Sequence, residues 1–167
     1  MSSDNEHHFL YILLLSAVTV VASQPSSCPH GWILRGSSCY LFITSTPEDW
    51  MTATSYCDIL HAKLVEIETV AEDEFLRLHL LDKKLTGGFW IGLSDIAVEG
   101  EWIWTSTQES PTYSDWFPGQ PDNIKHLQDC GQLLGGTYGF HWDDEICTRT
   151  KNFICEKELN GDVSIIG

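Results

Sequence analysis

Six cysteines constrain this chain of 167 residues more than any other feature of its sequence. They are Cys28, Cys39, Cys57, Cys130, Cys147 and Cys155. An even number of cysteines in a secreted chain of this length predicts a set of disulfides formed in an oxidising compartment. No two of them have the C-x2-C spacing of thiolate zinc sites, so a structural zinc ion is disfavoured. The spacing leaves the pairing open.

The N-terminus is expected to be a secretory signal peptide covering residues 1–22. An apolar segment runs from Phe9 to Ala22, is too short to span a bilayer, and is followed by small residues, with cleavage expected after Ala22. The residues before it contain no Lys or Arg, which leaves a short uncleaved anchor as the alternative. Cleavage would leave residues 23–167 as a single extracellular domain.

The charge of the chain limits its partners. The formal net charge is −15, and removal of Asp4 and Glu6 with the signal peptide leaves −13. Such an acidic chain is not expected to bind nucleic acid or anionic lipid surfaces. Acidic residues serve solubility in many proteins, but several carboxylates that converge provide a site for a hard cation such as Ca2+. The apolar content of 43% is enough for one packed core.

A first helix is expected to begin at Thr46. Thr46 is a suitable N-cap, and Pro47 suits the first helical position. Trp50, Ala53 and Cys57 then share one helical face, which predicts that a disulfide ties this helix to the core.

A second helix is expected to begin at Thr69, which forms a capping box with Glu72, and to end before the Gly pair at 87–88. Short apolar and aromatic runs separated by Gly, Pro, Ser and Asp predict strands in the remainder. Residues 106–129 form a long irregular stretch between them. A loop of this length inside a compact domain is usually functional or disordered, and the flanking Trp and Cys residues favour a pinned, functional loop.

The chain closely resembles the C-type lectin domain family over residues 28–157. The resemblance rests on the motifs CPHGWILRGSSCY, WIGL, EWIWT, WFPGQPDN, QDC, WDDEIC and FICEK. It implies an α+β fold of two helices, two small antiparallel sheets and a long calcium-binding loop region. It also implies three disulfides, which are Cys28–Cys39, Cys57–Cys155 and Cys130–Cys147.

The resemblance further implies one main calcium site. The family's ligands correspond to Gln120, Asp122, Gln128, Asp143 and Asp144 in this sequence. Ca2+ takes six to eight oxygen ligands, and these side chains supply amide and carboxylate oxygens from two segments. In the family the peptide bond of the Gln-Pro-Asp turn is cis, which directs both flanking side chains to one side. Each residue taken alone fits an ordinary turn or surface acid. Five matching positions together favour the calcium site.

An auxiliary calcium site is also indicated, and its residues are Asp95, Glu99, Asn123 and Asp129. A solvated acidic loop explains the same residues nearly as well. His126 and His141 lie near the main site in the sequence, which raises zinc as an alternative metal, although the surrounding oxygen ligands suit calcium better.

The sugar-binding residues are expected to be Gln120, Asp122, Gln128 and Asp143. A hydroxyl bound to calcium accepts a hydrogen bond from an amide and donates one to a carboxylate, so two amide–carboxylate pairs read two adjacent hydroxyls. In the family, Gln-Pro-Asp is similar to galactose-type sites. This turn favours galactose or N-acetylgalactosamine. The second pair, Gln128 and Asp143, exchanges the usual positions of acid and amide, and two such inversions would restore the symmetric pattern of a mannose-type site. Mannose-like equatorial diols and a broad specificity are therefore the alternatives.

Trp142 is expected to pack in the core, so any aromatic platform for the sugar has to come from other side chains near the site. The candidates are Tyr113, Tyr138 and His141.

The sequence thus predicts a secreted Ca2+-dependent lectin that binds terminal glycans, in innate immune recognition. One alternative is an acidic matrix protein that uses the same fold at mineral or ice surfaces. A metal-assisted hydrolase using His126 or His141 is disfavoured, because no activated nucleophile or catalytic motif is visible. No enzyme activity is expected. If the six cysteines pair internally, any oligomer is noncovalent, and no N-glycosylation sequon is present.

Overall fold

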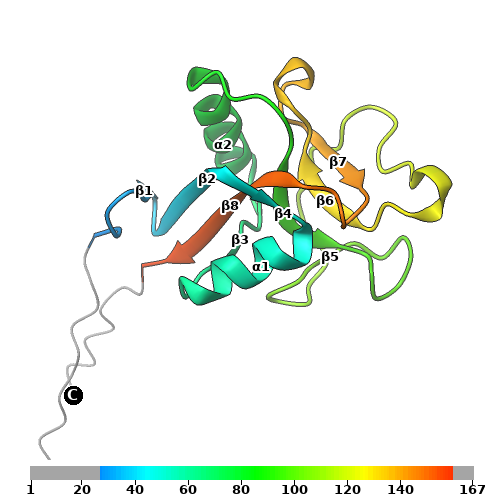
Figure 1. Cartoon of the computed structure of the whole chain (residues 1–167), viewed down its shortest axis with the longest axis horizontal. Helices are drawn as coiled ribbons and strands as arrows, with labels where there is room; N and C mark the ends of the chain where they lie inside the picture. The colour runs from blue at the N-terminus through cyan, green and yellow to red at the C-terminus, as the bar shows by residue number, and fades with distance from the viewer. Residues whose placement is uncertain (1–26, 160–167) are drawn as a thin grey trace, which may run out of the picture.

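The structure is a computed structural model, and it describes residues 27–159 (Figure 1). The expected signal peptide lies outside the described residues. The elements, in chain order, are β1 Ile33–Arg35, β2 Ser38–Glu48, α1 Trp50–Ile59, β3 Lys63–Leu64, α2 Val70–Asp82, β4 Phe89–Ser94, β5 Ile103–Trp104, η1 Ile124–His126, β6 Cys130–Leu133, η2 Gly136–Tyr138, β7 Trp142–Glu145 and β8 Lys151–Glu158. No helix among the described residues is long and apolar enough to cross a membrane.

The strands form one connected sheet in the order β1-β2-β8-β4-β6-β7, with β3 beside β8 and β5 beside β4. Two separate antiparallel sheets were expected. The structure joins them through a parallel pairing of β4 with β8, in which Phe89 faces Asn152 and Trp90 faces Phe153. The join is possible because β8 pairs with β2 along its length and still presents its first residues to β4. All other strand pairs are antiparallel.

The expected start of the first helix at Thr46 is wrong. Helix α1 begins after Asp49, whose carboxylate accepts hydrogen bonds from the Thr52 backbone N–H at 2.9 Å and from the Thr52 hydroxyl at 3.0 Å. Thr46 and Pro47 instead continue β2, which reaches Glu48 opposite Lys151 of β8. The backbone before Asp49 pairs with β8, so it is extended and not helical. Asp49 then caps the helix, since Asp is as favourable as Thr at this position.

Both helices bury the face that holds them to the sheet. In α1 the buried residues are Trp50, Ala53 and Cys57, as the sequence predicts. In α2 they are Asp73, Leu76 and Leu80. Helix α2 confirms Thr69 as its N-cap, because the Thr69 side chain accepts from the Glu72 N–H at 3.2 Å. The reciprocal bond of the expected capping box lies one residue earlier, since the Glu72 carboxylate accepts from the Glu68 N–H at 3.0 Å.

The three disulfides implied by the resemblance are formed, joining Cys28 to Cys39, Cys57 to Cys155, and Cys130 to Cys147. Trp142 lies in the core, as expected, with no exposed surface. The rings of Trp104, Tyr113 and Trp116 meet it edge-on at centroid distances of 5.6, 5.7 and 5.8 Å. This aromatic cluster fixes the start of β7, the strand that carries Asp143 and Asp144.

Candidate functional site

Asp144 of β7 fastens the Gln-Pro-Asp turn to the sheet. Its side chain is fully buried. One carboxylate oxygen accepts from the Asp122 N–H at 3.1 Å, and the other accepts from the Asn123 N–H at 2.6 Å. The two segments that the sequence placed in one site therefore do meet, through a carboxylate that satisfies two backbone donors of the turn.

Gln128 closes the loop between the turn and β6. Its side-chain N–H donates to the Asp144 carbonyl oxygen at 2.7 Å, and its side-chain oxygen accepts from the Ile124 N–H. Its own backbone N–H donates to the Asn123 side-chain oxygen at 3.1 Å. Gln128 is thus fixed at both ends of its amide.

Gln120 supplies an oxygen that the rest of the described protein does not use. The Gln120–Pro121 peptide bond is cis, as the resemblance implies. The Gln120 side-chain oxygen is buried, and it has no hydrogen-bond partner among residues 27–159. Buried acceptors without a partner are rare because they lose their hydration without compensation. An unpaired carbonyl oxygen at the expected ligand position is what a cation site requires.

Asp143 precedes Asp144 on β7 and bonds to the neighbouring strand β6. Asp143 is 7% exposed, and its carboxylate accepts from the Gln132 side-chain N–H at 2.7 Å. Burial raises the pKa of Asp143 to about 6, and the charges of Asp144 and Glu145 add to the rise. Burial also raises the pKa of Asp144, although its two backbone donors oppose the shift. No hydrogen bond among the described residues joins Asp143 to the other four expected ligands.

The auxiliary residues also lie together. The Asn123 side-chain N–H donates to the Glu99 carboxylate at 2.6 Å, and the Asp95 N–H donates to the Asp129 carbonyl oxygen at 3.2 Å. The Gly100 N–H donates to one Asp95 oxygen, while the other Asp95 oxygen is buried without a partner among residues 27–159. Burial raises the pKa of Asp95, with the charges of Glu99 and Asp129 adding to it.

The chemistry of the main set fits calcium. Its members offer two amide oxygens and three carboxylates, the hard oxygen donors that Ca2+ prefers. Within residues 27–159, no three His, Cys, Asp or Glu side chains are grouped closely enough to hold a metal ion alone. The amide oxygens of Gln120 and Gln128 are therefore needed to complete a calcium site here.

His141 has its ring nitrogens committed elsewhere. Arg77 of α2 lies 3.1 Å from His141 Nε2, and because Arg only donates, that nitrogen accepts and the ring proton lies on Nδ1. His141 Nδ1 then donates to Asp115 at 2.6 Å. Arg77 also donates to Asp115 at 2.9 Å and to the Gly139 carbonyl oxygen at 2.8 Å. This cluster anchors the long loop to α2 and leaves no free His141 nitrogen for zinc.

Two residues that organise this region escaped the sequence analysis. Arg77 joins three separate segments, and Gln132 orients Asp143. The signal for Gln132 was its polar side chain in the apolar strand CGQLL, two residues after Cys130. Arg77 had no such signal, because an Arg on an exposed helix face looks like any surface residue.

Tyr138 is the most open of the three aromatic candidates. It is 51% exposed, and its ring meets Phe117 edge-on at 5.5 Å. Tyr113 instead packs its ring against Trp142. His141 is held in the Arg77 cluster.

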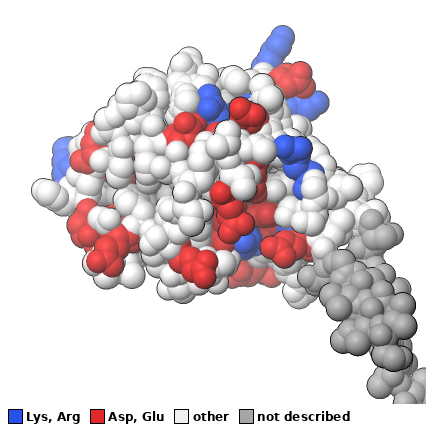
Figure 2. All heavy atoms as spheres, turned by 180° about the vertical axis from the view of Figure 1, so that it is seen from behind, with Lys and Arg blue, Asp and Glu red and all other residues white. Residues whose placement is uncertain are grey.

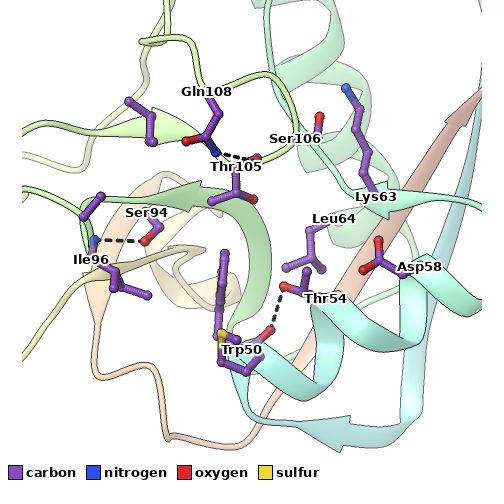
Figure 3. A pocket seen from close by; sticks show the side chains of 13 residues that line it. Trp50, Thr54, Asp58, Lys63, Leu64, Ser94, Ile96, Thr105, Ser106 and Gln108 are labelled. Atoms are coloured by element: carbon purple, nitrogen blue, oxygen red, sulfur yellow. Dashed lines mark hydrogen bonds between the residues drawn. The ribbon is translucent and has the colours of Figure 1, made fainter.

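A cavity of about 410 Å3 lies away from the expected ligand residues, between α1 and the β4–β5 region (Figure 3). Two of the polar groups in Figure 3 have partners within the cavity wall: the Thr54 hydroxyl donates to the Trp50 carbonyl oxygen, and the Ser94 hydroxyl accepts from the Ile96 N–H. None of the expected ligand residues lines this cavity, so the candidate site is sought in the loop region.

Carboxylates also gather beyond the loop region, and Figure 2 shows several acidic groups on one face with Lys and Arg among them. At the β8–β3 pairing, Glu156 accepts from the Ser38 hydroxyl at 2.8 Å and from the Glu66 N–H at 3.3 Å. Burial raises the pKa of Glu156 to about 7, and the charge of Glu72 contributes. Lys63 lies nearby, paired with Glu66 at 2.8 Å.

Known proteins share the sequence pattern and the fold of this chain. A family model described as the lectin C-type domain matches residues 46–157. Perlucin of Haliotis laevigata is 35% identical over 131 residues, which cover 78% of this chain and 83% of perlucin. The mouse scavenger receptor C-type lectin carbohydrate-recognition domain has a TM-score of 0.71 and 33% identity, covering 80% of this chain and 98% of that domain.

The same fold occurs in a calcium-independent type II antifreeze protein, with a TM-score of 0.69, 29% identity, and coverage of 79% of this chain and 95% of the other. C-type lectin domains bind carbohydrate and are not enzymes, which supports the expectation that this chain is not one. The match to more than half of the chain shows that this protein belongs to the C-type lectin domain family.

Proposed function

We propose that this protein is a secreted lectin that binds carbohydrate through calcium, with residues 23–167 as its single domain. The observation that carries the proposal is that Asp144 accepts from the Asp122 backbone N–H and Gln128 donates to the Asp144 carbonyl oxygen, while the Gln120 side-chain oxygen is buried and unpaired among residues 27–159. Asp143 lies one residue away on the same strand.

In this proposal the main site is held by Gln120, Asp122, Gln128, Asp143 and Asp144. The ion held by these residues would supply a Lewis acid for sugar hydroxyls. The protein's own part is to fix the turn on Asp144 and to present amide donors and carboxylate acceptors to those hydroxyls. Asp95, Glu99, Asn123 and Asp129 form an auxiliary site beside it.

The Gln120 and Asp122 pair favours galactose or N-acetylgalactosamine. Gln128 donates to the Asp144 carbonyl oxygen and Asp143 accepts from Gln132, so no hydrogen bond among the described residues joins the second pair. Because this pair exchanges the usual positions of acid and amide, mannose-like diols or a broad specificity are the rival. Recognition of foreign glycans in innate immunity is the role proposed for such a domain.

The test is retention on galactose and mannose resins in calcium, followed by elution with EDTA. We expect retention in calcium and release by chelator. Asp122→Asn keeps the shape of the turn but removes one of the three carboxylates, and it is expected to abolish retention. Asp82→Asn, on an exposed side chain of α2, is the matched control and should be retained like the wild type. Retention that survives EDTA would refute the calcium mechanism.

The sugar preference has its own test, which is a glycan array on the wild type and on Gln128→Glu/Asp143→Asn. The double variant restores the usual family order of acid and amide, so it is expected to keep calcium and to sharpen towards galactose. An unchanged profile would show that the second pair takes no part in reading the diol.

A structural role at a mineral or ice surface is the second candidate function. It is favoured by the formal charge of −15 and by the likeness to a calcium-independent antifreeze protein. It differs from the first proposal in one measurement, because adsorption to calcium carbonate or ice would then be unaffected by Asp122→Asn and by competing sugars.

A further inference from the structure

A second cavity, of about 330 Å3, adjoins the candidate site and shares Asp143 with it. The lining that matters comprises Gly88, Gln132, Tyr138, Asp143, Glu145 and Lys151. Its volume is within the usual range for small-molecule sites, which is about 300–1,000 Å3. We name it the Tyr138 cavity.

A buried amide is built into this cavity. Gln132 is 2% exposed, and its side-chain N–H donates to Asp143 at 2.7 Å. The Gln132 side-chain oxygen is buried and has no partner among residues 27–159. A Cβ at position 88 would lie 2.0 Å from that oxygen, so only Gly88 leaves room for the amide. Gln132 thus fills the space over Gly88 and holds the Asp143 carboxylate in the wall of the cavity.

The charges of the cavity select a neutral occupant. Lys151 is already paired with Glu145 at 2.9 Å and lies 5.4 Å from the centre of the Trp90 ring. The Asp143 carboxylate has no cationic partner within salt-bridge distance among the described residues. Lys151, the only cation of the lining, is thus already paired, while the carboxylates of Asp143 and Glu145 are acceptors, so the lining suits a ligand rich in hydroxyl or amide donors and offers no free cation to an anionic one.

Tyr138 gives the cavity an aromatic wall. The ring is half-exposed, and Phe117 supports it edge-on. A rigid ring with two side-chain torsions offers a flat contact surface at low entropic cost. The apolar face of a pyranose ring is a suitable partner for such a surface, while its hydroxyls point to the acceptors.

We propose that the Tyr138 cavity is a second sugar subsite, which binds a neutral pyranose linked to the residue held at the main site. The inference rests on the proposed lectin function, because the first residue has to be bound for the second to reach the cavity. It narrows the ligand class from single terminal sugars to neutral disaccharides or longer glycans, and it makes Tyr138 a determinant of specificity.

The experiment compares the affinity of a disaccharide with that of its monosaccharide by calorimetry in calcium. The probe pairs are lactose with methyl β-galactoside, and α1,2-mannobiose with methyl α-mannoside. For the wild type we expect at least one disaccharide to bind about tenfold more tightly than its monosaccharide, which corresponds to about 1.4 kcal/mol. Tyr138→Ala should reduce this ratio to near one. Tyr56→Ala removes an exposed tyrosine from α1 and should leave the ratio unchanged.

The outcomes separate the subsite from the main proposal. A purely structural role of Tyr138 would lower both affinities by the same factor and leave the ratio intact, which would overturn the subsite. Monosaccharide binding without any gain from the second residue would also overturn it, while the lectin proposal stands. Absence of all sugar binding by the wild type would overturn both. Tighter binding of sialylated or sulfated disaccharides than of neutral ones would contradict the charge argument.

Discussion

The region that holds the molecule together and the region that carries the candidate site differ in how their polar groups are satisfied. The scaffold region comprises residues 33–82 and β8, and its backbone is paired in strand ladders and two capped helices. The loop region comprises residues 95–145, and outside its strands β5, β6 and β7 side chains such as Asp144 and Gln128 bond the backbone.

Unpaired buried atoms follow the same division. Within residues 27–159, the buried side-chain atoms without a partner belong to Asp73, Asp95, Gln120 and Gln132, and the last three lie in the loop region. Leaving such groups unpaired costs stability, which the scaffold region has to offset. Three of these four unpaired atoms thus lie in the region for which ligand binding is proposed.

The disulfides give the largest test of this division. Cys57–Cys155 joins two residues of the scaffold region that are 98 positions apart in the sequence, with the whole loop region between them, and Cys130–Cys147 joins two residues 17 positions apart at the end of the loop region. Replacing Cys57 and Cys155 by Ala is expected to lower the free energy of unfolding by about 4–5 kcal/mol, because the unfolded chain regains the freedom of a long loop. Urea denaturation measures the change, and sugar binding by the folded fraction should be kept.

The matched variant replaces Cys130 and Cys147 by Ala. The shorter loop predicts a smaller loss, of about 3 kcal/mol. Sugar retention should nevertheless be lost, because this bond ties the start of β6, next to Gln128, to the segment following Asp144. Equal sugar binding by the two double variants would show that the two regions are not separable in this way.

Much of the scaffold follows from its own sequence. Thr69 and Glu72 satisfy the helix start locally, so the capping box predicts α2 correctly. The start of α1 does not follow, because pairing of Glu48 with Lys151 across the chain decides where β2 ends. The parallel β4–β8 pairing that unites the sheet is equally non-local and has no signal in either strand alone.

In the candidate site, too, features carried by the motifs could be predicted from the sequence, and a contact between neighbouring strands could not. Its residue types come from the family motifs, and the meeting of Asp122 with Asp144 bears out the expected arrangement of the two segments. The hydrogen bond of Asp143 with Gln132 was not foreseen, because it depends on the pairing of β7 with the neighbouring strand β6. The ligand roles of all these residues stay predictions.

Glu156 provides a pH test confined to the scaffold region. Its pKa is raised from 4.5 to about 7, mainly by burial, so the native protein binds more protons than the unfolded chain between these values. Stability therefore falls as pH rises from about 4.5 to 7, by about 3 kcal/mol at 1.36 kcal/mol per pKa unit. Glu156→Gln should remove this part of the pH dependence.

The measurement is urea denaturation of both proteins in EDTA at pH 4.5 and pH 7.5. The variant should gain stability relative to the wild type at pH 7.5 and little at pH 4.5. Asp82→Asn alters an exposed acid and serves as the control for net charge. A constant difference between wild type and Glu156→Gln at both pH values would show that the carboxylate does not titrate as its burial requires.

Arg77 connects the two regions, so its removal should affect both. Arg77→Met keeps the aliphatic length but removes the donors to Gly139, Asp115 and His141. Hydrogen bonds of charged groups contribute about 1.5–3 kcal/mol each, and partial exposure of this cluster reduces the expected loss to about 2 kcal/mol. Sugar affinity should fall as well, since the loop loses its anchor on α2.

Arg35→Met is the matched control, because Arg35 donates to a single carbonyl oxygen, that of Ala71, and lies over the Phe75 ring. We expect less than about 1 kcal/mol of lost stability and unchanged sugar affinity for this exposed contact. If Arg77→Met destabilises the protein but binds sugar like the wild type, the Arg77 cluster belongs to the scaffold alone.

The smallest effect is expected for a Lys→Gly substitution, made once in the scaffold region and once in the loop region. Lys84 and Lys125 both have positive φ, at 51° and 62°, a region that costs a residue with a Cβ about 1–2 kcal/mol. Lys84 follows α2, and its N–H donates to the Leu81 carbonyl oxygen, so its conformation is imposed by the helix end. Lys84→Gly should therefore stabilise the protein by about 0.5–1 kcal/mol after the entropic cost of Gly is subtracted.

Lys125 lies in η1 between Asn123 and His126, which also have positive φ. The side chains of Asn123 and Gln128 hold this segment, and no regular element continues through it. Lys125→Gly should gain less than Lys84→Gly, because extra freedom in the unfolded chain and in the loop offsets the relief of strain. Thermal unfolding of the two variants side by side measures the difference. A larger gain at Lys125 would mean that the loop region is held as firmly as the scaffold region, contrary to the division drawn from their hydrogen bonds.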